Sequence, residues 1–289
     1  MQTPAPTDYV RATSVANAIA LLEEHGEEAR ILAGGHSLLP MMKLRIARPE
    51  MLIDINDLDE LRGIRVEGDE LVLGAMVTHR EVLESPILSE HYAIFREAEK
   101  VIADPLVRNR GTVGGSMCQA DPSEDLSAVG SALHGTVVIR NSSGTRTVPL
   151  REFHEGPYET KVGPAEMLTE VRFPIRPGSG SAYEKVERRV GDWAVCSAGV
   201  FVTVKDGVVA DCGIGLTAVS AEHFCAPAAE AFLIGKAPSE ENLRAAAKMA
   251  GDASDPSSDQ RGPADYKKHL AEELTFRALT RAASASQGA

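Results

Sequence analysis

The sequence has few cysteines and no long apolar run, and these shortages exclude several classes of protein. Its four cysteines lie far apart and form no Cys-x-x-Cys pair, so neither a zinc site nor an iron–sulfur cluster is predicted. The sequence His154-Glu155 begins like a zinc-protease motif, but Tyr158 occupies the place of the second histidine. The longest uncharged apolar run, 193–204, is too short to cross a bilayer. We therefore expect no metal site and no membrane span.

Positive charge is also scarce. The chain carries 30 Lys and Arg against 42 Asp and Glu, a net charge of −12. This balance argues against a nucleic-acid partner, because binding to phosphates needs a concentrated basic face. The sequence starts without a basic stretch followed by an apolar one, so no secretory signal is visible. Reduced thiols are then the simplest state of the cysteines, and we expect a cytoplasmic protein.

The pattern of apolar residues predicts an α+β fold, and a length of 289 residues at about 150 per domain favours two domains. Helix, strand, helix and strand alternate over 14–25, 29–33, 38–44 and 51–55, which indicates a small parallel β-α-β unit. Hairpins over 63–73 and 137–148 and a strand over 167–173 indicate an antiparallel sheet. A linker is predicted at 176–181, followed by antiparallel strands over 182–218 and helices up to 281, with a fraying tail at 282–289.

Two segments each place a glycine pair beside hydroxyl residues: Ala33-Gly-Gly-His-Ser37 and Thr112-Val-Gly-Gly-Ser116. Glycine lets the backbone approach a bound group, so that consecutive N–H donors can converge on one anion. Two such loops facing each other could hold the two phosphoryl groups of a diphosphate from both sides. The alternative is that each pair is only a tight turn.

Other motifs have simpler explanations. The segment 213–218 fits the dinucleotide pattern G-x-G-x-x-A, but its apolar continuation favours a strand with closely packed glycines. His36 is a candidate base or a backbone-capping residue. An acidic cluster contains Asp121, Glu124 and Asp125, and Asp121 before a proline is placed to cap a helix. We predict no catalytic residue, and a cofactor would have to supply the chemistry.

Several longer segments resemble a known family. They are Ile31-Leu-Ala-Gly-Gly-His-Ser-Leu-Leu-Pro-Met-Met-Lys-Leu-Arg45, Ile53-Asp-Ile-Asn56, Asn109-Arg-Gly-Thr-Val-Gly-Gly-Ser116, Ala120-Asp-Pro-Ser-Glu-Asp125, 166–174, 182–185 and 191–194. In order and spacing they resemble the FAD-binding medium subunit of molybdenum hydroxylases, the family of carbon monoxide dehydrogenase and xanthine dehydrogenase. The resemblance implies a vanillyl-alcohol-oxidase-type (PCMH) FAD-binding domain over 1–177 and a C-terminal domain of strands and then helices over 178–289.

The resemblance also implies which residues line the FAD. On one side of the diphosphate they are Ile31, Leu32, Ala33, Gly34, Gly35, His36, Ser37 and Leu38; on the other they are Thr112, Val113, Gly114, Gly115 and Ser116; and elsewhere along the cofactor they are Ile102, Asp125, Leu168, Lys185 and Trp193.

Three of these residues have alternative roles that the sequence leaves open. Asp125 suits a sugar hydroxyl but could cap a helix. Lys185 could face the pyrimidine edge of the flavin or be a solvated lysine on a strand. Trp193 falls where family members place a residue close to the flavin, often Tyr, and it keeps the flat face but loses the hydroxyl. It could equally fill the core.

By the same resemblance, this chain is an electron-transfer subunit. Its partners would be a molybdenum-cofactor large subunit and a 2Fe-2S small subunit, in a dimer of heterotrimers that could contact the inner face of the membrane through its partners. Its FAD would pass electrons to an external acceptor: a quinone, oxygen or NAD. Two alternatives are a stand-alone FAD-dependent oxidase or reductase of the same fold and a nucleotide-binding scaffold without redox activity.

Overall fold

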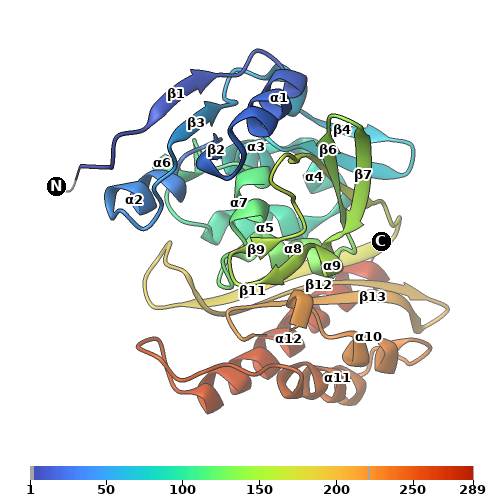
Figure 1. The fold of residues 1–289 in the computed structure, drawn as a ribbon. Helices are drawn as coiled ribbons and strands as arrows, with labels where there is room; N and C mark the ends of the chain where they lie inside the picture. Colours follow the sequence, from blue (N-terminus) through green and yellow to red (C-terminus); the bar gives the residue numbers. More distant parts are fainter. Residues whose placement is uncertain (1–2, 221, 289) are drawn as a thin grey trace.

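The computed structural model describes residues 3–220 and 222–288, which form a stack of layers (Figure 1). The first layer is a parallel sheet of β1 (Asp8–Arg11), β3 (Met51–Asp54) and β2 (Ala29–Leu32), in that order. Helix α1 (Val15–His25) connects β1 to β2, and the Ser14 side chain caps it by accepting from the Asn17 N–H. Helix α2 (Leu38–Lys43) connects β2 to β3, which confirms the predicted β-α-β unit. The additional strand β1 was not predicted.

The second layer is an antiparallel sheet with helices on it. Its strand order is β4 (Ile64–Glu67), β5 (Glu70–Gly74), β10 (Met167–Pro174), β6 (Thr136–Asn141) and β7 (Gly144–Pro149). The helices of this part are α3 (His79–Glu84), α4 (Pro86–His91), α5 (Ala93–Val101), α6 (Pro105–Arg108), α7 (Val113–Gln119), α8 (Asp125–Ala132) and α9 (Leu150–Phe153). A small hairpin of β8 (His154–Gly156) and β9 (Glu159–Thr160) follows α9. Both predicted hairpins are confirmed.

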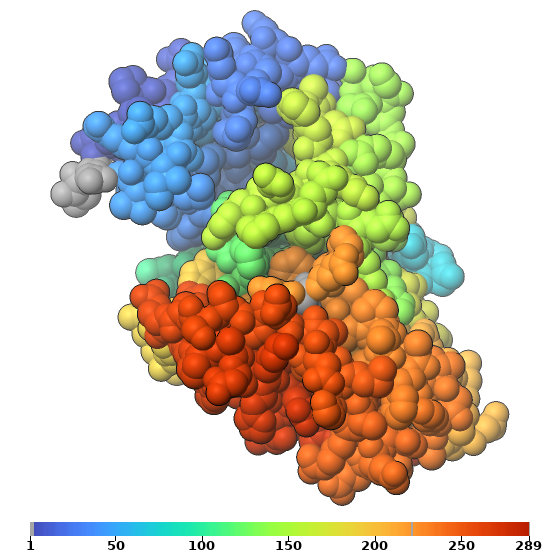
Figure 2. Space-filling model, turned by 60° about the horizontal axis from the view of Figure 1, so that its bottom comes forward, coloured from blue at the N-terminus to red at the C-terminus, as the bar shows by residue number. Residues whose placement is uncertain are grey.

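The C-terminal part is an antiparallel sheet covered by helices. The sheet has the order β11 (Ser179–Glu187), β12 (Ala194–Lys205) and β13 (Val208–Thr217), and the helices are α10 (Pro227–Leu233), α11 (Glu240–Asp252) and α12 (Ala264–Gln287). Short 3-10 turns occur at Gly26–Glu28, Asp59–Leu61 and Glu222–Phe224. Figure 2 shows the segment after about residue 210 (orange to red) as a thick layer applied to the rest of the molecule.

The C-terminal sheet belongs to two hydrophobic cores at once. One face packs on α12 in a core that contains Val200 and Leu274. Tyr183 and Phe201 instead join the core of the second layer, together with Phe95 and Phe173. The two halves of the chain therefore share a hydrophobic core at β11 and β12, and elements on either side of residue 178 can contribute to one site.

Two expectations about the C-terminal half are wrong. The linker predicted at 176–181 is shorter, because β11 already begins at Ser179. The tail does not fray at 282, because α12 continues to Gln287. Its last turns are held by the Ser286 hydroxyl, which donates to the Gly178 carbonyl at 2.6 Å and accepts from the Val204 N–H at 2.9 Å. Ala289 lies outside the described residues.

The strand interpretation of 213–218 is confirmed. A Cβ at Gly213 or Gly215 would lie 1.9 Å from a carbonyl oxygen of α8, that of Ala132 or Ala128 respectively. These glycines therefore let β13 pack directly on the α8 backbone and bind no nucleotide. Over residues 3–220 and 222–288, no helix is long and apolar enough to cross a membrane.

Candidate functional site

A cavity of about 1070 Å³ lies between the two glycine loops. Of the eighteen residues predicted to line the cofactor, sixteen line this cavity; Leu32 and Val113 do not. Leu32 ends β2 and does not line the cavity, although Ile31 and Ala33 on either side of it do. Val113 is 2% exposed and packs in the core of the second layer. The predicted residues thus converge on one space from segments far apart in the chain.

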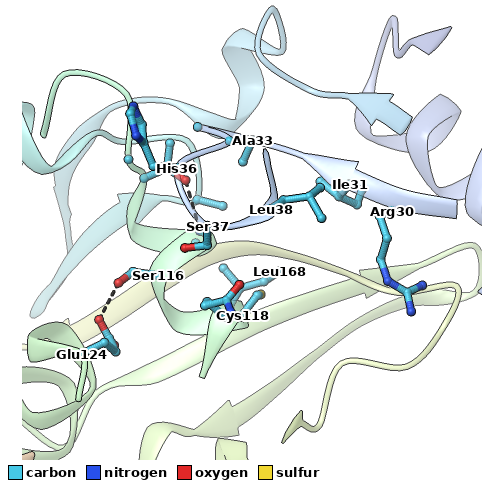
Figure 3. A pocket seen from close by; sticks show the side chains of 18 of the residues that line it. Arg30, Ile31, Ala33, His36, Ser37, Leu38, Ser116, Cys118, Glu124 and Leu168 are labelled. Atoms are coloured by element: carbon cyan, nitrogen blue, oxygen red, sulfur yellow. Dashed lines mark hydrogen bonds between the residues drawn. The ribbon is translucent and has the colours of Figure 1, made fainter. Parts of the chain in front are cut away.

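The first glycine loop follows β2 and leads into α2. Gly35 has φ of +78°, a conformation that favours glycine. Among the described residues, none accepts a hydrogen bond from the N–H groups of Gly34, Gly35, His36, Ser37 or Leu38. A run of unpaired N–H groups at the start of a helix is a binding site for an anion. Figure 3 shows the Ser37 side chain directed into the cavity, whereas the His36 ring points away from Ser116.

The second glycine loop of the sequence is, in the structure, the Thr112 cap and the first turn of α7, and its hydrogen bonding differs from that of the first loop. Its N–H groups are already used: those of Val113 and Gly114 donate to carbonyls of residues 77 and 75, both at 2.8 Å, and that of Gly115 donates to the Thr112 hydroxyl at 3.1 Å. The expectation that both loops supply N–H donors is therefore wrong for the second loop.

The second loop instead forms a wall of small residues. A Cβ at Gly115 would lie 3.9 Å from the Ala33 Cβ, and a Cβ at Gly34 would lie 2.0 Å from the Arg110 carbonyl oxygen. The first loop therefore touches the backbone just before the second loop at Gly34, and both Gly34 and Gly115 line the cavity. A Cβ at Gly115 would also lie 2.8 Å from the Thr112 hydroxyl oxygen, so a side chain there would crowd the cap of α7 at the cavity wall. The pairing of a donor-lined loop with a bare wall fits the diphosphate of FAD, which needs donors on one side and close approach on the other.

Asn56, which follows β3, holds the two loops together. Its side-chain amide donates to the Ala33 carbonyl at 2.8 Å and to Asp54 at 2.7 Å, while its oxygen accepts from the Arg110 guanidinium at 3.2 Å. Asp54 also accepts from the Tyr9 hydroxyl at 2.5 Å. Sequence analysis missed this role. The only signal was the position of Asn56 directly after a strand in a segment that carried the family resemblance.

Glu124, and not Asp121, caps α8. The Glu124 carboxylate accepts from the N–H groups of Leu126 at 3.2 Å and Ser127 at 2.7 Å, and from the hydroxyls of Ser116 and Ser127. Asp121 instead accepts from the Ser123 N–H at 2.9 Å, which is a local turn. Because the Ser116 hydroxyl donates to Glu124 (Figure 3), it can only accept from a group in the cavity.

Asp125 and Lys185 form a buried ion pair in the cavity wall. The Lys185 Nζ lies 2.8 Å from Asp125 Oδ2, and the two side chains are only 2% and 5% exposed. Lys185 also donates to the Val101 carbonyl at 3.0 Å, and the Tyr183 hydroxyl donates to Asp125 at 2.6 Å. Burial raises the pKa of Asp125, and Lys185 opposes that rise. Lys185 is thus not a solvated lysine, and Asp125 is the first residue of α8 rather than its cap.

Apolar side chains complete the cavity. Leu168 on β10 is 4% exposed, and Ile102 at the end of α5 is half-buried. Trp193 lies in the loop before β12, lines the cavity and is 45% exposed, so it does not fill the core. The site can therefore hold an anion, polar hydroxyls and flat rings. These groups suit the binding of a cofactor that supplies the chemistry itself.

Comparisons with known proteins agree with this geometry. Residues 5–176 match the family model described as the FAD binding domain in molybdopterin dehydrogenase, and residues 181–282 match the CO dehydrogenase flavoprotein C-terminal domain. The chain is 41% identical over 280 residues to the carbon monoxide dehydrogenase medium chain of Afipia carboxidovorans, covering 96% of this chain and 97% of that one. It is 33% identical over 276 residues to the glyceraldehyde dehydrogenase medium chain of Sulfolobus acidocaldarius, covering 96% and 98%.

Solved structures show the same fold. The carbon monoxide dehydrogenase from Hydrogenophaga pseudoflava contains a chain that superposes with a TM-score of 0.95 at 44% identity, covering 98% of this chain and 99% of that one. For quinoline 2-oxidoreductase from Pseudomonas putida 86 the TM-score is 0.92 at 32% identity, with 99% of each chain covered. The chain belongs to the FAD-binding medium subunits of the carbon monoxide dehydrogenase and molybdenum hydroxylase family, which are oxidoreductase subunits with FAD as their cofactor.

Proposed function

We propose that this chain works within a molybdenum hydroxylase complex, where it receives electrons from a 2Fe-2S small subunit and passes them through FAD to a quinone, oxygen or NAD. A molybdenum-cofactor large subunit would oxidise the substrate, in a dimer of heterotrimers. The observation that carries this proposal is the row of unpaired N–H groups at 34–38 facing the bare wall of Gly115. When bound there, FAD supplies the capacity to accept and release electrons.

The residues of this chain would bind and orient the cofactor. The N–H groups of 34–38 would hold the diphosphate, and Ser116, whose proton is committed to Glu124, would accept a hydrogen bond. The Asp125–Lys185 pair would present its remaining lone pairs and charge to the polar part of the flavin and its chain of hydroxyls. Trp193 would cover one side of the ring system at the mouth of the cavity.

We further propose that the chain divides at 177/178 and that the complex is cytoplasmic. The division is supported by the different sheets on either side of it, although the cavity draws residues from both. The location is supported by the cysteines, since Cys118, Cys196, Cys212 and Cys225 are all unpaired thiols.

A charge placed in the first glycine loop tests the site. Ser37 is exposed, lines the cavity and makes no capping hydrogen bond, so its replacement leaves the packing intact. In Ser37→Asp the carboxylate would repel the diphosphate. At about 5 Å and an effective dielectric constant of about 20, one pair of charges costs about 3 kcal/mol, and solvent reduces this to about 1–3 kcal/mol. FAD affinity should therefore fall about 10- to 100-fold, as measured by flavin fluorescence titration.

Ser37→Asn is the matched control, because it has nearly the same size and no charge. It should bind FAD within about threefold of the parent chain. Equal FAD affinities for the Asp and Asn variants would show that the diphosphate is not held by this loop.

The electron-transfer role is tested in the assembled complex. The complex is reduced anaerobically with limiting dithionite and mixed with a soluble quinone, with oxygenated buffer or with NAD⁺, while reoxidation is followed through the visible absorbance of the whole complex. The parent complex should be reoxidised by one of these acceptors, and a FAD-depleted complex that carries Ser37→Asp should not. Wild-type rates without FAD would refute the proposal. Turnover of NAD(P)H or a small alcohol by the isolated chain would instead support a stand-alone enzyme, and purification without any flavin would support a scaffold.

A further inference from the structure

A buried histidine–glutamate pair forms part of the cavity floor and has no role in the site described above. His79 is the first residue of α3, and Glu99 lies on α5. The His79 Nδ1 lies 3.0 and 3.1 Å from the two Glu99 oxygens. Glu99 is completely buried, whereas His79 is 6% exposed and lines the cavity. Within the pair, Glu99 is therefore inaccessible, and only the His79 imidazole borders the cavity.

The Nε2 atom of His79 is the ring nitrogen available to a bound group. Because Nδ1 is bound to Glu99, only Nε2 can reach the cavity. Nε2 makes no hydrogen bond to any residue within 3–220 or 222–288, and it is not among the buried unpartnered atoms. A Cβ at Gly111 would lie 2.8 Å from the His79 Cδ2 and 3.3 Å from Nε2, so the glycine keeps this edge of the ring clear.

The pair also fixes what Nε2 can do. A carboxylate on Nδ1 orients the ring and favours the protonated imidazole, in which Nε2 is a donor. The charged groups around it are Glu99 from α5, Glu124 and Asp125 from the start of α8, and Arg108 from α6, which acts on Glu99. Burial lowers the pKa of His79, but the carboxylates, Glu99 above all, outweigh it and leave that pKa raised.

We propose that His79, oriented by Glu99, donates a hydrogen bond from Nε2 to an oxygen of bound FAD. Lys185 supports this assignment because it is already committed to Asp125 and the Val101 carbonyl, which leaves the His79 Nε2 as an uncommitted donor on the floor. The recipient is a phosphate oxygen or a carbonyl oxygen of the flavin ring. The inference rests on the proposed FAD site, since it needs the cofactor in this cavity.

The test compares His79→Gln and Glu99→Gln with His269→Gln, an exposed position on α12 outside the cavity. FAD affinity of the full chain is measured by fluorescence titration from about pH 6 to 9, a range that covers the ordinary histidine pKa and the values above it. In the parent chain affinity should decrease as pH rises and Nε2 loses its proton. Both cavity variants should bind about 10- to 100-fold more weakly at the acidic end, because one charge-assisted hydrogen bond is lost, and should show a flattened pH profile. The control should match the parent.

Two further measurements, ADP affinity and the flavin reduction potential, identify the oxygen that accepts the hydrogen bond. If the recipient is a phosphate, ADP affinity falls with FAD affinity and the flavin reduction potential is unchanged; if it is a ring oxygen, the potential falls and ADP binding is unchanged. Parent-like FAD affinity, pH profile and potential in both cavity variants would overturn the inference. If Ser37→Asp still weakens FAD binding in that case, the proposed site stands and only His79 is excluded. Should His79→Gln fail to fold, Glu99→Gln gives the same comparison with an intact imidazole.

Discussion

Removing the positive charge of Lys185 should destabilise the protein through the carboxylate that it leaves behind. In Lys185→Met, Asp125 stays in a site where only 5% of its side chain is exposed and loses its cationic partner. The Tyr183 hydroxyl, which donates at 2.6 Å, remains as a neutral donor. Breaking a buried pair in this way costs about 3–5 kcal/mol, far more than the pair itself contributes. We expect that loss in the free energy of unfolding of the FAD-free chain at neutral pH.

The double variant Lys185→Met with Asp125→Asn isolates the cause. It removes both charges and keeps the Tyr183 hydrogen bond, so it should recover at least about 2 kcal/mol of the loss. The pH dependence gives a second check. Burial already raises the pKa of Asp125 above its usual value, and loss of Lys185 raises it further. A carboxyl with a raised pKa in the folded state destabilises the fold when ionised, so the single variant should regain stability on acidification more than the parent does.

Urea unfolding followed by circular dichroism measures these differences. Lys248→Met on α11 is the matched control, because Lys248 pairs with Asp252 on the surface and both side chains are more than half exposed. It should unfold like the parent. A Lys185→Met variant as stable as the parent, or a double variant less stable than the single one, would refute the interpretation of Asp125 as a stranded charge.

Three other predictions follow from the site and the core. Asn56→Ala should weaken FAD binding about 5- to 50-fold while the FAD-free chain keeps most of its stability, because the lost bonds to Ala33 and Arg110 align two loops; equal losses in titration and unfolding would contradict this role. FAD should quench the fluorescence of Trp193, the single tryptophan, and Trp193→Phe should abolish the signal without abolishing FAD binding measured by flavin fluorescence. Burial lowers the pKa of His154 to about 4, so stability should fall as pH drops from about 6.5 toward 4, and His154→Gln should reduce that slope in urea unfolding at both ends of the range.

The parts of the fold that sequence predicts well depend on local signals. The β-α-β unit and the two hairpins were predicted from patterns of apolar, glycine and polar residues over short stretches, and helix caps such as that of Ser14 and the Thr78–Glu81 capping box are likewise local. The first glycine pair precedes α2 and the second lies in the first turn of α7. That they meet in space came from the family resemblance and not from a local pattern.

The remaining features depend on contacts between distant segments. The N–H groups of Val113 and Gly114 donate to carbonyls of residues 77 and 75, which no local pattern around Gly114 reveals. Asp125 and Lys185 are 60 residues apart in the chain. The last turns of α12 pack directly against the backbone of β11. A Cβ at Gly180 would lie 2.0 Å from the Ala282 carbonyl oxygen, so this close approach requires the glycine. Composition alone made this tail resemble a frayed end.

The cavity draws its lining from both halves of the chain. Lys185 and Trp193 reach the cavity from the C-terminal half, whereas the loops that would grip the diphosphate belong to the N-terminal half. A dinucleotide bound in the cavity would therefore contact both halves of the chain at the same time. By linkage, FAD bound there would stabilise the folded arrangement of both halves together, and not only of the half that holds its diphosphate.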